Sequence, residues 1–426
     1  DITTGRIKPD DAQANVEKCL NINGRAVFST QGEYMLLPVV VDTTARTIAA
    51  TAYANVDLAF PFFGMEDPRV TIESAALYSD KQIEVAMMLD VTGSMGKTKK
   101  TDKIGDLQNA ARNAVKTMLD EQDPKKPRIR VSIVPYASGV NTGGLGKNVF
   151  FESSASGDLP PVQDSAVIKA ATGKTELPSY KEYLKIVADS FPAPAKTKCA
   201  TERKLLDGTA DLSGDGPDTI RKNKNDKAYW AMVNRDDHMT TSGMNSCPDA
   251  PVIPLTADAA ALLDSIKDFK ASGYTGGAIG IQWTYYMLSS KWRDVIADAG
   301  LGSGPSPSNP KHLAKVAILM TDGQFNTAYA GAGSNYNGQG NLARKNAESL
   351  CKNMRNEGIE IFTIGFDLNN PDMSEAERNA AKGVLKNCAS TTPSTTKHYF
   401  EASTGEELDA AFQAIIANTE KIALTK

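Results

Sequence analysis

A continuous apolar run at residues 85–89 is the feature that most constrains the fold, because it leads directly into Asp90. Runs of this kind are typical of strands that are buried on both faces of a parallel sheet. Apolar residues then recur at three- and four-residue spacing over residues 102–120, which predicts a helix with one face on a core. Residues 129–134 form the next predicted strand. A strand, a helix and a second strand in this order indicate an α/β fold.

The same alternation returns in the C-terminal part of the chain. Strands are predicted at residues 316–320 and 359–366, with a helix at residues 342–357 between them. A T-x-x-E capping box, from Thr404 to Glu407, begins a last amphipathic helix. We therefore expect a doubly wound, mostly parallel sheet with helices on both faces.

The chain has 426 residues, enough for two or three domains of about 100–200 residues each. Residues 1–82 contain short alternating stretches between turns and favour a small β-rich domain. Residues 145–251 carry scattered Gly, Pro, Ser, Lys and Asp and predict a loop-rich insertion. The sheet domain would then have two parts, residues 83–144 and residues 252–426.

Charge and hydropathy argue against two classes of partner. A formal net charge of −4 provides no basic field for nucleic acid. The longest apolar run, residues 35–41, is far shorter than the roughly 20 residues that span a bilayer. Because the chain begins with Asp1 rather than Met, we expect that an upstream segment, a signal or a membrane anchor, was removed from it.

The order of the five cysteines suggests two disulfides. Cys199 with Cys247, and Cys351 with Cys388, each bracket one local segment and leave Cys19 over. Oxidised pairs would place the protein outside the cytoplasm. The alternative is five reduced thiols in the core.

Oxygen-bearing side chains gather at three predicted loops. Asp90, Thr92 and Ser94 alternate directly after one strand, and Asp322 follows a second strand. Thr275 lies in a Gly-rich loop between two predicted helices. Carboxyl ends of parallel strands meet at one sheet edge, so we expect these loops to converge there. A set of carboxylates and hydroxyls suits Mg²⁺, Mn²⁺ or Ca²⁺; the alternative is that the two aspartates cap the following helices.

This pattern resembles the von Willebrand factor A (vWA) domains, whose metal-ion-dependent adhesion site (MIDAS) has D-x-[ST]-x-S, a later Thr, and an Asp before Gly. The resemblance implies that Asp90, Thr92, Ser94, Thr275 and Asp322 are the five site residues. It also implies one divalent cation, Mg²⁺ foremost, that stays incompletely neutralised because hydroxyls dominate its shell. An acidic residue of a protein partner would complete that shell, with residues 324–340 at its rim.

Several stretches carry a narrower resemblance: residues 85–95, 247–258, 350–351 with 359–366, and 387–400 through to the C-terminal end. They resemble the TadG-like proteins of bacterial tight-adherence (Tad) pilus systems. This resemblance implies an extracytoplasmic, non-enzymatic adhesion or assembly protein, anchored by an N-terminal membrane segment that this chain lacks.

Two other functions stay open as alternatives. One is a cytoplasmic vWA subunit that serves an ATP-driven or metal-inserting enzyme as an adaptor, and reduced cysteines would favour it. The other is a metal-dependent hydrolase. A phosphatase of the D-x-D type is disfavoured because Thr92 stands where the second carboxylate belongs. His238, His312 and His398 form no catalytic pattern.

Weaker patterns have simpler interpretations. Asp211 and Asp215 resemble the first half of a calcium loop, but Lys222 stands where the bidentate Glu belongs, which favours a polar turn. We expect a flexible turn at residues 143–147, a solvated charged turn at Asp236, Asp237 and His238, and core packing for Trp283, Tyr285 and Tyr286.

Overall fold

The computed structural model describes residues 9–27, 34–42, 47–55, 69–77, 81–120, 122–123, 126–151, 173, 176–190, 198–226, 228–234, 247–332, 336–371, 373–391 and 396–425. They form two compact units. The smaller comprises described residues from 1–82, 120–128 and 420–426, and the larger those from 83–119 and 129–419.

The larger unit is built on a six-stranded sheet in the order β13-β6-β5-β14-β15-β16. β5 pairs with β6 in parallel, β15 pairs in parallel with both β14 and β16, and edge strand β13 runs antiparallel to β6. All residues of β15 are buried, as expected for a strand covered on both faces. The strands are β5 (Gln82–Asp90), β6 (Ile129–Tyr136), β13 (Ile253–Thr256), β14 (Leu313–Thr321), β15 (Glu360–Phe366) and β16 (Tyr399–Ala402).

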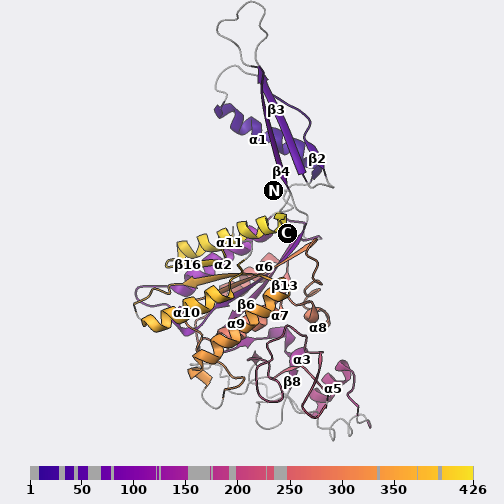
Figure 1. Ribbon diagram of the computed structural model, residues 1–426, viewed down its shortest axis with the longest axis vertical. Coiled ribbons are helices and arrows are strands. Elements are labelled where there is room, and N and C mark those ends of the chain that lie inside the picture. The colour runs from indigo at the N-terminus through magenta and orange to yellow at the C-terminus, as the bar shows by residue number, and fades with distance from the viewer. Residues whose placement is uncertain are drawn as a thin grey trace, which may run out of the picture. The chain divides into compact units, whose positions relative to one another are not determined.

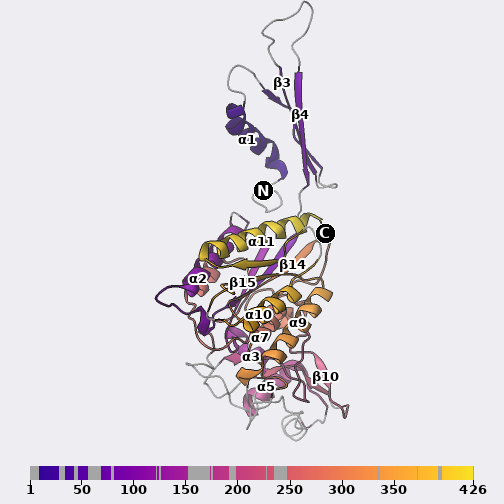
Figure 2. The same ribbon diagram turned by 60° about the vertical axis from the view of Figure 1, so that its left-hand side comes forward.

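Helices cover both faces of this sheet (Figures 1 and 2). One face carries α2 (Lys103–Leu119), α6 (Ala259–Lys267) and α11 (Gly405–Thr425), and the other carries α7 (Gly277–Tyr286), α9 (Gly340–Asn356) and α10 (Glu375–Cys388). Helix α7 is buried along its whole length, including Trp283, Tyr285 and Tyr286, so the predicted core packing of these aromatics is confirmed. The predicted α/β class, with a mainly parallel sheet between helices, is also confirmed.

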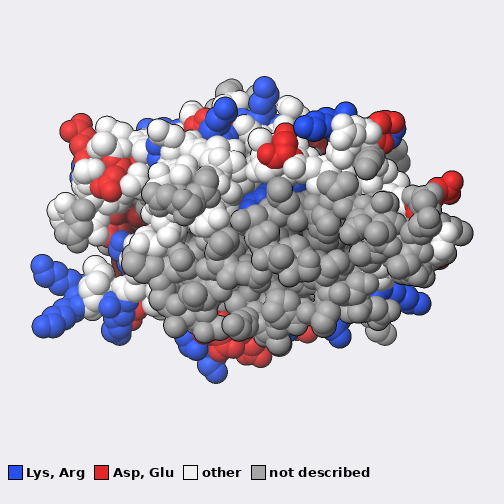
Figure 3. Space-filling view, turned by 90° about the horizontal axis from the view of Figure 1, so that it is seen from below, with Lys and Arg blue, Asp and Glu red and all other residues white. Residues whose placement is uncertain are grey.

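The described part of residues 145–251 has short elements, seen at the bottom of Figure 1. Figure 3 shows the molecule from below, and described side chains of both charges, Lys and Arg as well as Asp and Glu, are visible in this view. The elements are α3 (Gly146–Val149), β8 (Phe150–Phe151), α5 (Tyr180–Ser190), β9 (Cys199–Ala200), β10 (Ile220–Lys222), β11 (Ala228–Trp230) and β12 (Val233–Asn234). Elsewhere lie β7 (Val140–Asn141), α8 (Arg293–Asp298), and the 3₁₀ turns η1 (Pro9–Asp11), η2 (Gly93–Met95), η3 (Gly143–Leu145), η4 (Ser290–Trp292) and η5 (Tyr336–Gly338).

The smaller unit combines an antiparallel sheet with one helix. Strand β3 (Thr47–Asn55) pairs along one edge with β1 (Tyr34–Leu36) and β2 (Val40–Asp42), and along the other with β4 (Arg69–Leu77). Helix α1 (Ala12–Val27) was not predicted, because Asn and Gly interrupt its apolar positions. Within the described residues, no helix combines the length and the apolar character that a bilayer span requires.

Both predicted disulfides are present in the larger unit. Cys199 pairs with Cys247, and Cys351 on α9 pairs with Cys388, the last residue of α10. Cys19 belongs to neither. Each cross-link stabilises its segment by about 2–4 kcal/mol through the restricted unfolded chain.

The cysteine arrangement gives a direct prediction. Thiol titration of the unreduced protein in denaturant should detect one thiol, that of Cys19, and the variant C19S should give none. After reduction, both proteins should gain four thiols. Five thiols in the unreduced protein would contradict the pairing.

Candidate metal-binding site

Asp90, the last residue of β5, is fully buried and held by neutral donors. Its Oδ1 accepts a hydrogen bond from the backbone N–H of Thr92 at 2.9 Å. Its Oδ2 accepts from the Tyr136 hydroxyl at 2.7 Å and from the Thr321 hydroxyl at 2.8 Å. Burial raises the pKa of Tyr136 well above its usual value, so this phenol stays a proton donor. The carboxylate of Asp90 is therefore fixed in orientation.

Thr92, Ser94 and Asp322 form a chain of oxygens beside Asp90. The hydroxyls of Thr92 and Ser94 lie 3.0 Å apart, and Ser94 Oγ donates to Asp322 Oδ1 at 2.6 Å. The backbone N–H of Asp322 reaches Asp90 Oδ2 at 3.4 Å. Two loops separated by more than 200 residues in sequence are thus joined, as the strand-end placement predicted.

Thr275, in the loop before α7, lines a cavity of about 620 Å³ together with Ser94 and Asp322. The backbone N–H of Thr275 donates to Asn326 Oδ1 at 3.1 Å, and that of Gly93 donates to Gly273 O at 2.9 Å. All three loops are therefore in direct contact.

Two further charged residues at this edge were not predicted. Lys103 Nζ lies 3.1 Å from Asp322 Oδ2 and 3.0 Å from Asp367 Oδ2. Burial opposes its charge, but the two carboxylates outweigh burial and raise the pKa of Lys103. Asp367 directly follows β15, so its strand-end position was the sequence signal for it. Lys103 begins α2 and had no comparable signal.

The charged form of Asp322 is disfavoured by its surroundings. Burial, and then the charge of Asp90, raise the pKa of Asp322 to about 6, while Lys103 and Ser94 act in the opposite direction. The donors are two carboxylates and three hydroxyls. Within the described residues no group of three or more His, Cys, Asp or Glu could hold a metal ion, so the hydroxyls are a necessary part of this donor set. These residues fit a hard divalent cation such as Mg²⁺.

The hydrogen bonds of Asp90 and Asp322 are not those of helix caps, which was the alternative interpretation of these two residues. Asp90 bonds to Thr92, Tyr136 and Thr321, and Asp322 bonds to Ser94 and Lys103. The carboxylate that accepts from the first turn of α2 is that of Asp102, through the N–H of Gly105.

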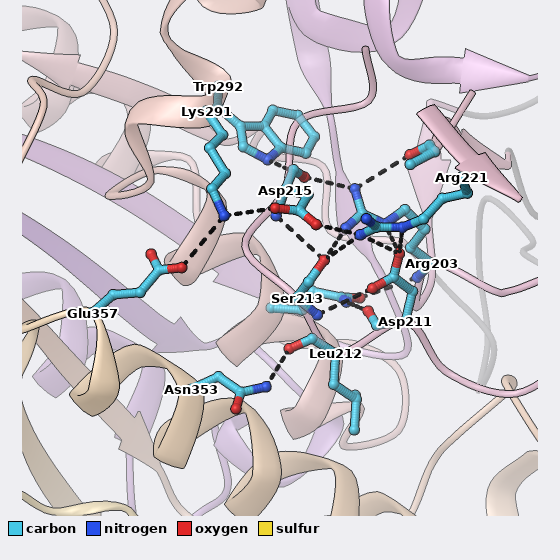
Figure 4. A network of polar contacts seen from close by, with 12 residues as sticks. Arg203, Asp211, Leu212, Ser213, Asp215, Arg221, Lys291, Trp292, Asn353 and Glu357 are labelled. Carbon is cyan, nitrogen blue, oxygen red and sulfur yellow. Dashed lines mark hydrogen bonds and ion pairs between the residues drawn. The ribbon is translucent and has the colours of Figure 1, made fainter. Parts of the chain in front are cut away.

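Basic side chains contact the two aspartates of the half-loop at residues 211–216 (Figure 4). Asp211 pairs with Arg203 at 3.1 Å and with Arg221 at 3.2 Å, and Asp215 pairs with Arg221 and, at 2.6 Å, with Lys291. Burial alone would raise the pKa of Asp215, but Lys291 and Arg221 lower it to about 2. The predicted charged turn at residues 236–238 lies outside the described residues. Residues 143–147, which were predicted to be a flexible turn, form short helical turns.

Glu202 connects the insertion to the rim loop that follows Asp322. It is buried, and its Oε2 accepts from the backbone N–H of Tyr329 at 3.0 Å. Burial raises the pKa of Glu202 to about 7, although the backbone hydrogen bonds oppose this. The carboxyl is therefore more easily protonated in the folded than in the unfolded protein.

Comparisons with known proteins give distant structural likenesses. No protein-family model and no curated protein matches the chain. The vWF domain of the type V pili tip protein Mfa5 from Porphyromonas gingivalis is 13% identical with a TM-score of 0.40, covering 82% of this chain and 97% of that one. The pilus adhesin SpaC from Lactobacillus rhamnosus GG is 10% identical with a TM-score of 0.40, covering 91% and 34%. The PilB minor pilin from Streptococcus sanguinis is 10% identical with a TM-score of 0.37, covering 93% and 80%. Likeness at this level assigns no function.

Glu202 gives a pH prediction. Because its pKa is raised in the folded state, its contribution to stability is fully present below its usual pKa of 4.5 and is lost as the pH rises through about 7. Between pH 5 and pH 8 the variant E202Q should lose about 2–3 kcal/mol less unfolding free energy than the wild type. Urea unfolding at both pH values measures this, and equal losses would contradict it.

Proposed function

We propose that the chain binds one divalent cation through Asp90, Thr92, Ser94, Thr275 and Asp322, and binds a protein partner through that ion. Mg²⁺ is the first choice, with Mn²⁺ and Ca²⁺ as alternatives. The single observation that carries this is the meeting of Ser94, Thr275 and Asp322 from three separate loops on one cavity. The vWA motif order in the sequence supports the same assignment.

The donor set supports binding of an acidic partner. Three of the five proposed ligands are neutral hydroxyls, so a bound divalent ion would keep part of its charge and offer a position to an outside carboxylate. Tyr136 and Thr321 hold Asp90 from inside the protein, and Asn326 holds the Thr275 backbone. The chain's own residues thus orient the ligands and leave the cavity side open to an Asp or Glu of the partner.

For the biological role we propose an adhesion or assembly component of a pilus system of the tight-adherence type, acting outside the cytoplasm. Two disulfides support the location, since such bonds persist in oxidising compartments. The TadG-like sequence stretches support a pilus system of the tight-adherence type. We also propose that an upstream membrane segment anchors the protein. We propose binding rather than catalysis, and neither nucleic acid nor a cytoplasmic enzyme complex as partner.

Removal of one hydroxyl tests the cation site. Isothermal titration calorimetry with MgCl₂ should give saturable, one-site binding to the wild type, and T275V should bind at least about tenfold more weakly because one oxygen ligand is lost. At 100 times Kd, Mg²⁺ should stabilise the wild type by about 2.7 kcal/mol.

T101V is the matched control, because Thr101 lines the same cavity but is not a proposed ligand. It should bind Mg²⁺ as the wild type does. The proposal fails if the wild type binds neither Mg²⁺ nor Mn²⁺, or if T275V binds them with wild-type affinity.

Carboxylate binding is tested with acetate as a probe. With protein in excess over Mn²⁺, the methyl proton signal of acetate should broaden more for the wild type than for T275V, because acetate reaches the protein-bound paramagnetic ion. Acetamide, which is neutral, should show little broadening with either protein. Equal broadening of acetate and acetamide by the Mn²⁺-loaded wild type would exclude a carboxylate position on the ion.

A further inference from the structure

Lys103 places a buried positive charge inside the proposed cation site. Its side chain is 9% exposed, and its ammonium bridges Asp322 at 3.1 Å and Asp367 at 3.0 Å. The second oxygen of Asp322 accepts from Ser94. Both oxygens of Asp322 are therefore bonded within the protein itself, one of them by a cation.

The position of Lys103 is not explained by helix stability. It is the first residue of α2, where the helix dipole is positive and a cation is unfavourable. What holds the ammonium there is the pair of carboxylates. Asp90, Asp322 and Asp367 with Lys103 carry a formal charge of −2.

Asp367 is a fixed second acceptor for this ammonium. Its backbone is left-handed, with φ +52°, and its N–H donates to Ala402 O at 2.7 Å. The same carboxylate oxygen that faces Lys103 accepts from Asn370 Nδ2 at 3.2 Å. If Lys103 leaves Asp322, the carboxylate of Asp367 still supplies a counter-charge for its ammonium.

We infer that Lys103 is a built-in competitor of the divalent cation: it holds Asp322 when no ion is bound and is retained by Asp367 when the ion takes Asp322. This rests on the proposed cation site and adds to it a residue that sets the affinity. Removal of the ammonium frees one oxygen of Asp322 and removes a like charge from beside the ion, and both changes favour ion binding.

The variant K103M tests this by calorimetry with MgCl₂. It should bind Mg²⁺ at least about tenfold more tightly than the wild type, and its melting temperature without metal should be lower, because Asp322 loses its counter-charge. K97M is the matched control: it removes the same charge from an exposed pair with Asp102. Its Mg²⁺ affinity should stay within about twofold of wild type.

The variant D367N should change the Mg²⁺ affinity in the opposite direction. It also provides a second test of the competitor role if K103M does not fold. Asn tolerates the left-handed backbone of residue 367, but offers the ammonium no counter-charge, so Lys103 should stay on Asp322 and Mg²⁺ should bind at least about threefold more weakly. In the K103M background the same change should have a smaller effect, because the competitor is gone.

The outcomes separate this inference from the proposed function. If the wild type binds Mg²⁺ and T275V does not, while K103M binds no more tightly than the wild type, the competitor role is wrong and the cation site stands. An effect of D367N that is equal in the presence and absence of Lys103 also overturns the competitor role. If the wild type binds no divalent ion, both proposals fall.

Discussion

The mutual repulsion of two buried carboxylates, Asp90 and Asp322, is the constraint on which the site depends. Both stand at the carboxyl ends of neighbouring strands, where the sheet gives them little contact with water. The structure offsets the repulsion with neutral hydroxyls on Asp90 and with the ammonium of Lys103 on Asp322. A divalent cation would offset it further, and this need connects the fold to the proposed binding function.

The rest of the larger unit keeps these groups in place. The loop with Thr275 enters α7, whose buried aromatic residues fix it against the sheet. The insertion is tied to the same framework by Lys291 on Asp215 and by Glu202 on the rim loop. A partner that meets the cavity would therefore meet a surface whose loops are held from several sides.

Local patterns predicted the elements whose signal is periodic burial. The four central strands β6, β5, β14 and β15 and helices α2, α9 and α11 follow from apolar spacing, and Asp90 and Asp322 follow from their positions at strand ends. The edge strands β13 and β16 were not predicted. Lys103 and Asp367 were missed because their pairing depends on how α2 approaches β15, which no local pattern contains. Helix α1 was missed because its apolar face is interrupted. For the half-loop at 211–216 a polar turn was predicted, but not its arginine partners, because they come from outside the loop.

The most direct measurement of the central claim is a crystal structure of the protein with Mn²⁺, with the ion located by its anomalous scattering. We predict one peak within bonding distance of oxygens from Ser94, Thr275 and Asp322, in the cavity that these residues line. A structure at saturating Mn²⁺ with no peak there, or with these side chains turned away from a common point, would contradict it.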